Sequence, residues 1–130
     1  MKNWTITLIL VFLVVSWIPQ VEGEEKLTPG DLYDAGIELF HKEKYEEAVT
    51  TFSRIIFVFP KSNLVSYSQY MIGQCNLKMG KYEEAIQQFE FYLKAYPEGD
   101  RVKNSEQGIQ SSKEKLKEKA LVLERQEKRV

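Results

Sequence analysis

The spacing of hydrophobic residues predicts a chain built of helices. From residue 28 onward, apolar residues recur at intervals of three and four, the period of a helix that buries one face. Four such segments are separated by turn signals, and a fifth, longer segment follows them. No segment shows the two-residue alternation of a half-buried strand, so the fold class predicted is all-α.

The first two predicted helices have clear boundary signals. Thr28 is expected as the N-cap of the first helix, with Pro29 at its first position and Asp31 completing a capping box. This helix is expected to end near Lys42. The second helix follows a short polar turn and ends before Pro60, which cannot continue a helix.

The third and fourth helices repeat this arrangement. The third is predicted from about Leu64 to Met79, where Gly80 supplies a C-terminal stop. The fourth begins near Tyr82 and ends before Pro97.

The last helix is predicted to be long, from about Arg101 to Arg125 or beyond, with Asp100 as its N-cap. Its inward positions recur every seven residues with two serines between them, so the apolar seam is thin and only its first half has a repeat to pack on. These positions are Val102, Ser105, Ile109, Ser112, Leu116 and Leu123.

The chain repeats itself at an offset of 37 residues. The segment Lys44–Val49 reappears as Lys81–Ile86, with only the last residue changed. Self-similarity at such a period indicates stacked helical hairpins that share a continuous core. Further pairs match at the same offset: Tyr33 and Tyr70, Gly36 and Gly73, Phe52 and Phe89, and Pro60 and Pro97.

These residues resemble the tetratricopeptide repeat, which has a Gly within its first helix, then an Ala, an aromatic residue and a Pro in its second. The matching positions are Gly36, Ala48, Phe52 and Pro60 in one copy, and Gly73, Ala85, Phe89 and Pro97 in the other. The resemblance implies an α-solenoid of two hairpins plus a long C-terminal capping helix. The expected domains are a signal peptide (1–23), two repeats (24–100, at about 28–60 and 64–97) and a capping helix with a charged tail (101–130).

The repeat length points to a subgroup of this family. The usual period is about 34 residues, and the longer spacing here is similar to bacterial envelope members, namely the outer-membrane-assembly lipoprotein and the periplasmic partner of the Tol–Pal system. The chain has no cysteine near its N-terminus to bear a lipid, and no room for the N-terminal coiled coil of the Tol–Pal protein. Two repeats are fewer than the usual three, which leaves self-association as an alternative.

The resemblance also implies a binding groove, because the first helix of each pair lines a concave surface in this family. Exposed aromatic side chains with a few polar groups suit an extended or helical peptide. Tyr33 and Tyr70 have a second interpretation, packing against the neighbouring hairpin. The expected groove residues are Tyr33, Ile37, Phe40, His41, Tyr67, Tyr70, Gln74, Leu77 and Lys78.

The sequence offers little for catalysis. His41 is the only histidine, no cluster has the spacing of metal ligands, and no Gly-rich loop follows a strand. The adjacent glutamates at 46–47 and 83–84 point apart on a helix and complement its N-terminal dipole. We therefore expect a non-enzymatic scaffold without a cofactor or metal.

Charge is distributed unevenly although the net charge is only −1. Residues 24–100 carry 8 Lys/Arg against 13 Asp/Glu, whereas residues 101–130 carry 9 against 5. We expect a protein or peptide partner and no nucleic acid. For the basic tail, a solvated helix end, a self-association helix, a partner-binding helix and contact with an acidic envelope polymer or membrane surface all remain open.

The N-terminus has the order of a secretory signal peptide. Lys2 precedes a 15-residue apolar run from Trp4 to Ile18, Pro19 breaks the run, and Val21-Glu22-Gly23 resembles a cleavage site. The run is shorter than the ~20 residues that span a bilayer comfortably. We expect an exported protein of the periplasm or cell envelope without a stable membrane span after cleavage; an uncleaved anchor is the alternative.

We predict that cleavage follows Gly23. N-terminal sequencing of the exported protein should then begin at Glu24. Recovery of an intact Met1 or Lys2 from the membrane fraction would indicate an uncleaved anchor instead.

Overall fold

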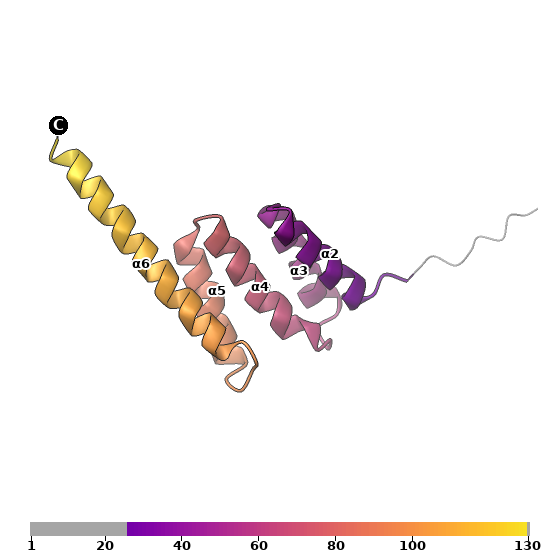
Figure 1. Ribbon diagram of the computed structural model, residues 1–130. Helices are drawn as coiled ribbons and strands as arrows, with labels where there is room; N and C mark the ends of the chain where they lie inside the picture. The colour runs from indigo at the N-terminus through magenta and orange to yellow at the C-terminus, as the bar shows by residue number, and fades with distance from the viewer. Residues whose placement is uncertain (1–25, 130) are drawn as a thin grey trace, which may run out of the picture.

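The computed structural model describes residues 26–129, and every regular element in this part of the chain is a helix (Figure 1). The bounds agree with the sequence-based expectation to within two residues. The expected signal peptide lies outside the described residues. The helices are α2 (Pro29–His41), α3 (Tyr45–Val58), α4 (Leu64–Lys78), α5 (Tyr82–Ala95) and α6 (Val102–Glu127).

The helices form two layers. Each helix packs on the next along the chain, and α4 also contacts α2 and α6. Within the described residues α3 and α5 do not contact each other. The inner layer therefore consists of α2, α4 and α6, and the outer layer of α3 and α5. This arrangement confirms two tetratricopeptide-like hairpins closed by a long C-terminal helix, whose second half extends beyond the hairpins (Figure 1).

Each hairpin is held by a close approach between a glycine and a phenylalanine ring. A Cβ atom added to Gly36 would lie 2.6 Å from the ring of Phe52, and the same addition at Gly73 would lie 2.6 Å from the ring of Phe89. Both rings are fully buried. Any larger side chain at these glycines would force the two helices apart, which is why the repeat pattern requires glycine there.

The helix α6 packs on α5 through small residues. Ser105, Gly108 and Ser112 are buried, and Gly108 faces the other side of the Phe89 ring. The predicted apolar seam has the right register, but its distal member, Leu123, is 52% exposed. Only the first half of α6 is thus integrated into the core.

The N-terminal boundary of α6 differs from the prediction. The N-cap is Arg101 rather than Asp100, and no side chain caps this helix. The Asp100 carboxylate instead accepts a hydrogen bond of 2.6 Å from the Tyr67 hydroxyl. A long-range contact to α4 therefore replaces the local capping interaction.

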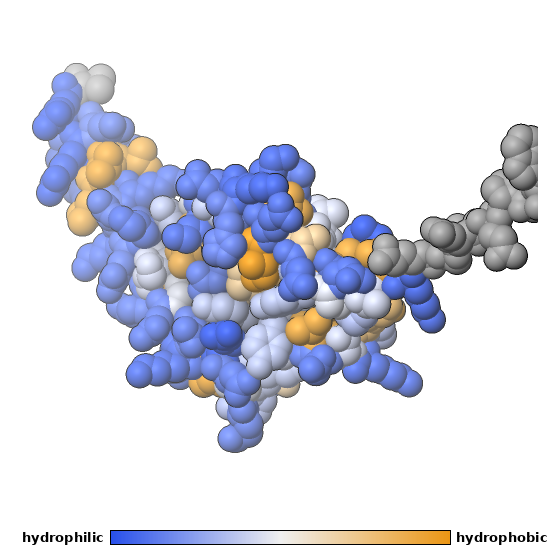
Figure 2. All heavy atoms as spheres, turned by 45° about the vertical axis from the view of Figure 1, so that its right-hand side comes forward, coloured by the Kyte–Doolittle hydropathy of each residue, from blue (hydrophilic) through white to orange (hydrophobic). Residues whose placement is uncertain are grey.

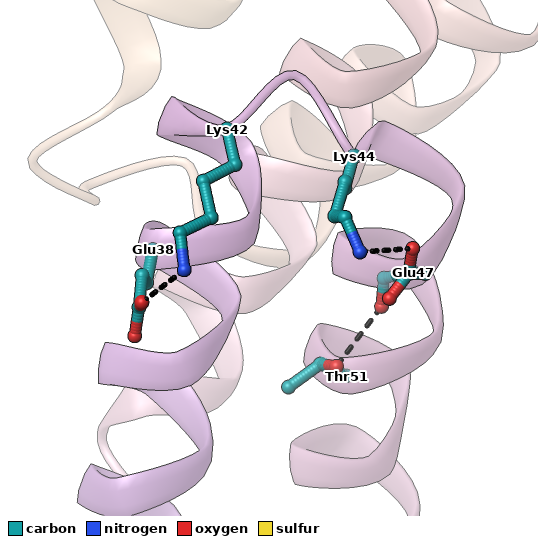
Figure 3. Close-up of polar contacts among 5 residues, drawn as sticks. All are labelled: Glu38, Lys42, Lys44, Glu47 and Thr51. Carbon is teal, nitrogen blue, oxygen red and sulfur yellow. Dashed lines mark hydrogen bonds and ion pairs between the residues drawn. The ribbon is translucent and has the colours of Figure 1, made fainter.

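The solvent-facing side of the first hairpin carries ion pairs between residues three or four positions apart in the sequence. Lys42 pairs with Glu38 at 2.5 Å, and Lys44 pairs with Glu47 at 3.2 Å (Figure 3). Thr51 donates to the main-chain oxygen of Glu47 at 2.9 Å. Exposed pairs of this kind contribute about 0–1 kcal/mol. The hydrophobic core, and not this charge pattern, supplies most of the stability.

The turn that joins α2 to α3 and the turn that joins α4 to α5 differ at one position. Gly80 follows α4 with φ of 73°, a left-handed conformation that glycine adopts freely. The equivalent residue in the first hairpin is Glu43, which has φ of 60°. The first turn therefore holds a residue with a Cβ atom in a conformation that disfavours it.

We predict that Glu43→Gly raises the free energy of unfolding by about 0.5–1 kcal/mol, because relief of the left-handed strain exceeds the extra entropy of an unfolded glycine. Chemical denaturation would measure the change. Glu43→Gln removes the charge and keeps the strained backbone, so it should leave stability nearly unaltered. A gain of equal size in Glu43→Gln would show that charge rather than backbone conformation is responsible.

Candidate partner-binding site

The nine expected groove residues all lie on α2 and α4, the first two helices of the inner layer. His41 and Lys78 are exposed, and the other seven are half-buried. The structure divides them into two groups. Phe40 and His41 lie at the turn end of α2, where the Phe40 ring packs against His41 at 6.1 Å and Tyr45 at 5.3 Å between centroids.

The second group gathers tyrosines from both hairpins. Tyr33 packs on Phe52 with ring centroids 5.5 Å apart, and Tyr70 packs on Phe89 at 5.9 Å. Each tyrosine therefore contacts the phenylalanine of its own hairpin and still presents part of its ring to solvent. These ring contacts lie within each hairpin, whereas the packing interpretation named the neighbouring hairpin, and the partial exposure of both rings is compatible with partner contact.

Arg101 joins the tyrosines and was missed by the sequence analysis. Its guanidinium carbon lies 5.6 Å from the ring centroids of both Tyr67 and Tyr70, within the range of cation–π contacts. The repeat pattern gives no signal for it, because the residue 37 positions earlier is Leu64. We call Tyr33, Tyr67, Tyr70 and Arg101 the tyrosine–arginine cluster.

The backbone around Arg101 is fixed by α5. Its main-chain N–H donates to the hydroxyl of Tyr92 at 3.2 Å, and Tyr92 is buried. One residue earlier, Asp100 is tied to Tyr67 on α4. The start of α6 is thereby anchored to both preceding helices, which places the guanidinium over the inner layer.

The phenol groups of the cluster resist ionisation. Burial raises the pKa of Tyr33 and of Tyr70, with the nearby positive charge of Arg101 acting in the opposite direction. The hydrogen bond to Asp100 raises the pKa of Tyr67. All three hydroxyls are therefore neutral near pH 7. Gln74 donates to the Tyr70 oxygen at 2.9 Å and orients that ring.

The chemistry of this site is that of recognition. Amphipathic tyrosine rings can cover an apolar group, and one guanidinium beside them can donate hydrogen bonds to a neighbouring acceptor. Between residues 26 and 129 there is no group of His, Cys, Asp and Glu side chains that could hold a metal ion. The Glu46 carboxylate lies 3.4 Å from the Lys81 amine, on the solvent side of the turns.

A hollow on the surface lies at the turn ends of the hairpins, away from the cluster. Charged residues dominate its lining, together with Tyr45 and Met79. It does not include any of the nine groove residues.

The family model described as YfiO, outer membrane lipoprotein, matches residues 25–107 of the sequence. The match covers both hairpins and the first turns of α6, and so includes the whole tyrosine–arginine cluster. No curated protein matches the chain. Over the described residues, no helix combines the length and apolar character needed to cross a bilayer.

The cysteine bears on the lipoprotein description. Cys75 is the only cysteine of the sequence, and it lies inside α4 with no exposed surface. Burial raises the pKa of its thiol to about 12. A thiol held in this way is inert, and Cys75 lies far along the sequence from the N-terminus.

We predict an alkaline loss of stability that depends on Cys75. The folded-state pKa is raised from 9.0 to about 12. Between these values the unfolded thiol loses its proton while the folded thiol keeps it, so stability is fully present below pH 9 and falls as pH rises toward 12. Denaturation midpoints measured from pH 8 to 11 should therefore fall more steeply for the wild type than for Cys75→Ala. Parallel pH profiles would contradict the assignment.

Proposed function

The chain belongs to the YfiO family of outer membrane lipoproteins, and on that premise we propose that it is a non-enzymatic scaffold that binds a protein partner through its inner helical layer. The family places the protein in the cell envelope. We propose further that it reaches the envelope by the N-terminal export signal, with cleavage after Gly23.

The tyrosine–arginine cluster is the observation that supports this proposal. Three tyrosines from two consecutive inner helices remain partly exposed beside one guanidinium. Tyrosine and arginine are enriched among the residues that dominate binding energies at interfaces. The rings of Tyr33 and Tyr70 are already packed on Phe52 and Phe89, so these two side chains have little freedom left to lose when a partner binds.

The surface extends along the inner layer beyond this cluster. Ile37, Phe40 and Leu77 add half-buried apolar area, and His41 and Lys78 add polar groups at its edge. An apolar centre with a polar rim is the usual composition of an interface. A peptide or helix of the partner lying across α2 and α4 would contact both hairpins at once.

A second candidate function, self-association, is supported by the free half of α6. Leu121, Val122 and Leu123 are 45%, 45% and 52% exposed on the part of the helix that extends beyond the hairpins. Figure 2 shows hydrophobic residues gathered near that end of the molecule. A helical segment as short as the free half of α6 is only marginally stable by itself in water, so a contact with a second copy would stabilise it. A molecular mass that rises with concentration in sedimentation experiments would favour this function.

We predict that Tyr33→Ala and Tyr70→Ala each weaken partner binding by ~1 kcal/mol or more, equivalent to about fivefold in affinity. A photo-crosslinking amino acid at the exposed inner position of Lys78 would capture the partner in envelope preparations. Each tyrosine variant should reduce that crosslink, and circular dichroism should show that helix content is kept.

The matched control is a crosslinker at Phe91, which is 56% exposed on the outer helix α5. It should not capture the same species. If Phe91 gives the same crosslink, or if the tyrosine variants lose thermal stability and keep the crosslink, the inner layer is not the binding surface.

A further inference from the structure

Within residues 26–129, the guanidinium of Arg101 has no partner of opposite charge. None of its N–H groups donates to a protein acceptor within residues 26–129, and its Nε atom is buried without a hydrogen bond. None of the ion pairs of the described chain includes it. Buried donors that lack an acceptor are rare in folded proteins, so each requires an explanation.

The surroundings of Arg101 offer few acidic partners. The central inner helix α4, against which the guanidinium lies, contains no acidic residue. The carboxylate of the adjacent Asp100 is engaged by the Tyr67 hydroxyl at 2.6 Å. An array that is acidic overall thus leaves this guanidinium without a carboxylate within the described residues.

We propose that Arg101, held over the rings of Tyr67 and Tyr70, receives a carboxylate side chain from an acidic segment of the protein partner. This inference rests on the proposed function and specifies the chemistry of the partner. The partner segment carries Asp or Glu beside an apolar or aromatic residue, and the latter lies against Tyr33 and Tyr70.

The geometry favours a carboxylate in two ways. A guanidinium is planar, and since the Nε atom is buried here, the two terminal Nη groups are the ones that can donate two parallel hydrogen bonds to the oxygens of a carboxylate. The guanidinium carbon lies 5.6 Å from both tyrosine ring centroids, and these contacts restrict the Arg101 side chain before the partner arrives, so less side-chain freedom is lost on binding.

The local charge disfavours a more highly charged anion. The site has a single guanidinium, and Asp100 lies next to it in sequence. Asp34 is close enough to act on the neighbouring Tyr33. These two negative charges would repel the dianion of a phosphate group more strongly than a monoanion.

Arg101 has one competing role, that of a clamp between α6 and α4. A clamp would act through cation–π contact alone and would be indifferent to ligand charge. The two roles separate when binding and stability are measured on the same variants.

The test uses the exported protein and two labelled dodecapeptides. One has glutamate at every second position with leucine and tyrosine between, and the other has glutamine in place of glutamate. We expect fluorescence anisotropy to show at least tenfold tighter binding of the glutamate peptide. The preference should weaken at high salt and should disappear in Arg101→Gln.

Arg54→Gln is the matched control, because Arg54 is an exposed arginine on the outer helix α3. It should keep the full preference for glutamate. Arg101→Lys should keep part of it, since the charge remains and the planar fork is lost. Equal binding of the two peptides by the wild type, or an unchanged preference in Arg101→Gln, would overturn the proposal.

A measurement on the wild type removes dependence on variants that fail to fold. Addition of the glutamate peptide should shift the ¹⁵N–¹H side-chain resonance of Arg101 and leave that of Arg54 in place. Inorganic phosphate at equal concentration should displace the peptide only weakly. No shift at Arg101, or displacement by phosphate at stoichiometric amounts, would contradict a carboxylate site.

Failure of the carboxylate site and failure of the scaffold function give different results. A crosslink from Lys78 without glutamate preference would leave the scaffold in place and remove only the carboxylate assignment. Glutamate preference without a crosslink from Lys78 would leave the anion site and remove the envelope partner on the inner layer.

Discussion

The close contact between glycine and phenylalanine is the constraint on which the rest of the structure depends. Gly36 admits the ring of Phe52, and Gly73 admits that of Phe89, at distances that exclude any Cβ atom. This contact fixes how near the two helices of each hairpin lie. Helix proximity in turn determines where the inner faces of α2 and α4 meet, and therefore where Tyr33 and Tyr70 project.

The fold could be predicted well from the sequence because the glycine and phenylalanine that form this contact occur twice, at the same spacing. Repetition at 37 residues of glycine, alanine, phenylalanine and proline specifies helix ends and close crossings together. Ala48 and Ala85 are both fully buried, as their places in the pattern require. The long last helix was also predicted, since it contains no proline and its inward positions keep a fixed spacing.

The features that the sequence did not reveal are those in which a residue departs from the repeat. The left-handed conformation of Glu43 could not be predicted, because a glutamate in a turn gives no signal for it and only the equivalent position of the second repeat holds a glycine, Gly80. Asp100 was read as a local cap, but its hydrogen bond goes to Tyr67, 33 residues away. Arg101 joins the cluster through its contacts with Tyr67 and Tyr70, which are distant in the sequence. The repeat period therefore predicted the position of Tyr70 but not the arginine that lies over its ring. Whether the groove residues contact a partner stays a prediction.

The ring of Phe89 has a consequence for the order in which the molecule assembles. It lies between Gly73 on one side and Gly108 on the other, so it belongs to the second hairpin and to the docking surface of α6 alike. Until α4 and α5 close on each other, that ring has no fixed position and α6 has no surface to recognise. Docking of α6 therefore requires that the second hairpin has formed. Because Arg101 begins this helix, the cation reaches the tyrosines only in a chain whose repeats are already formed.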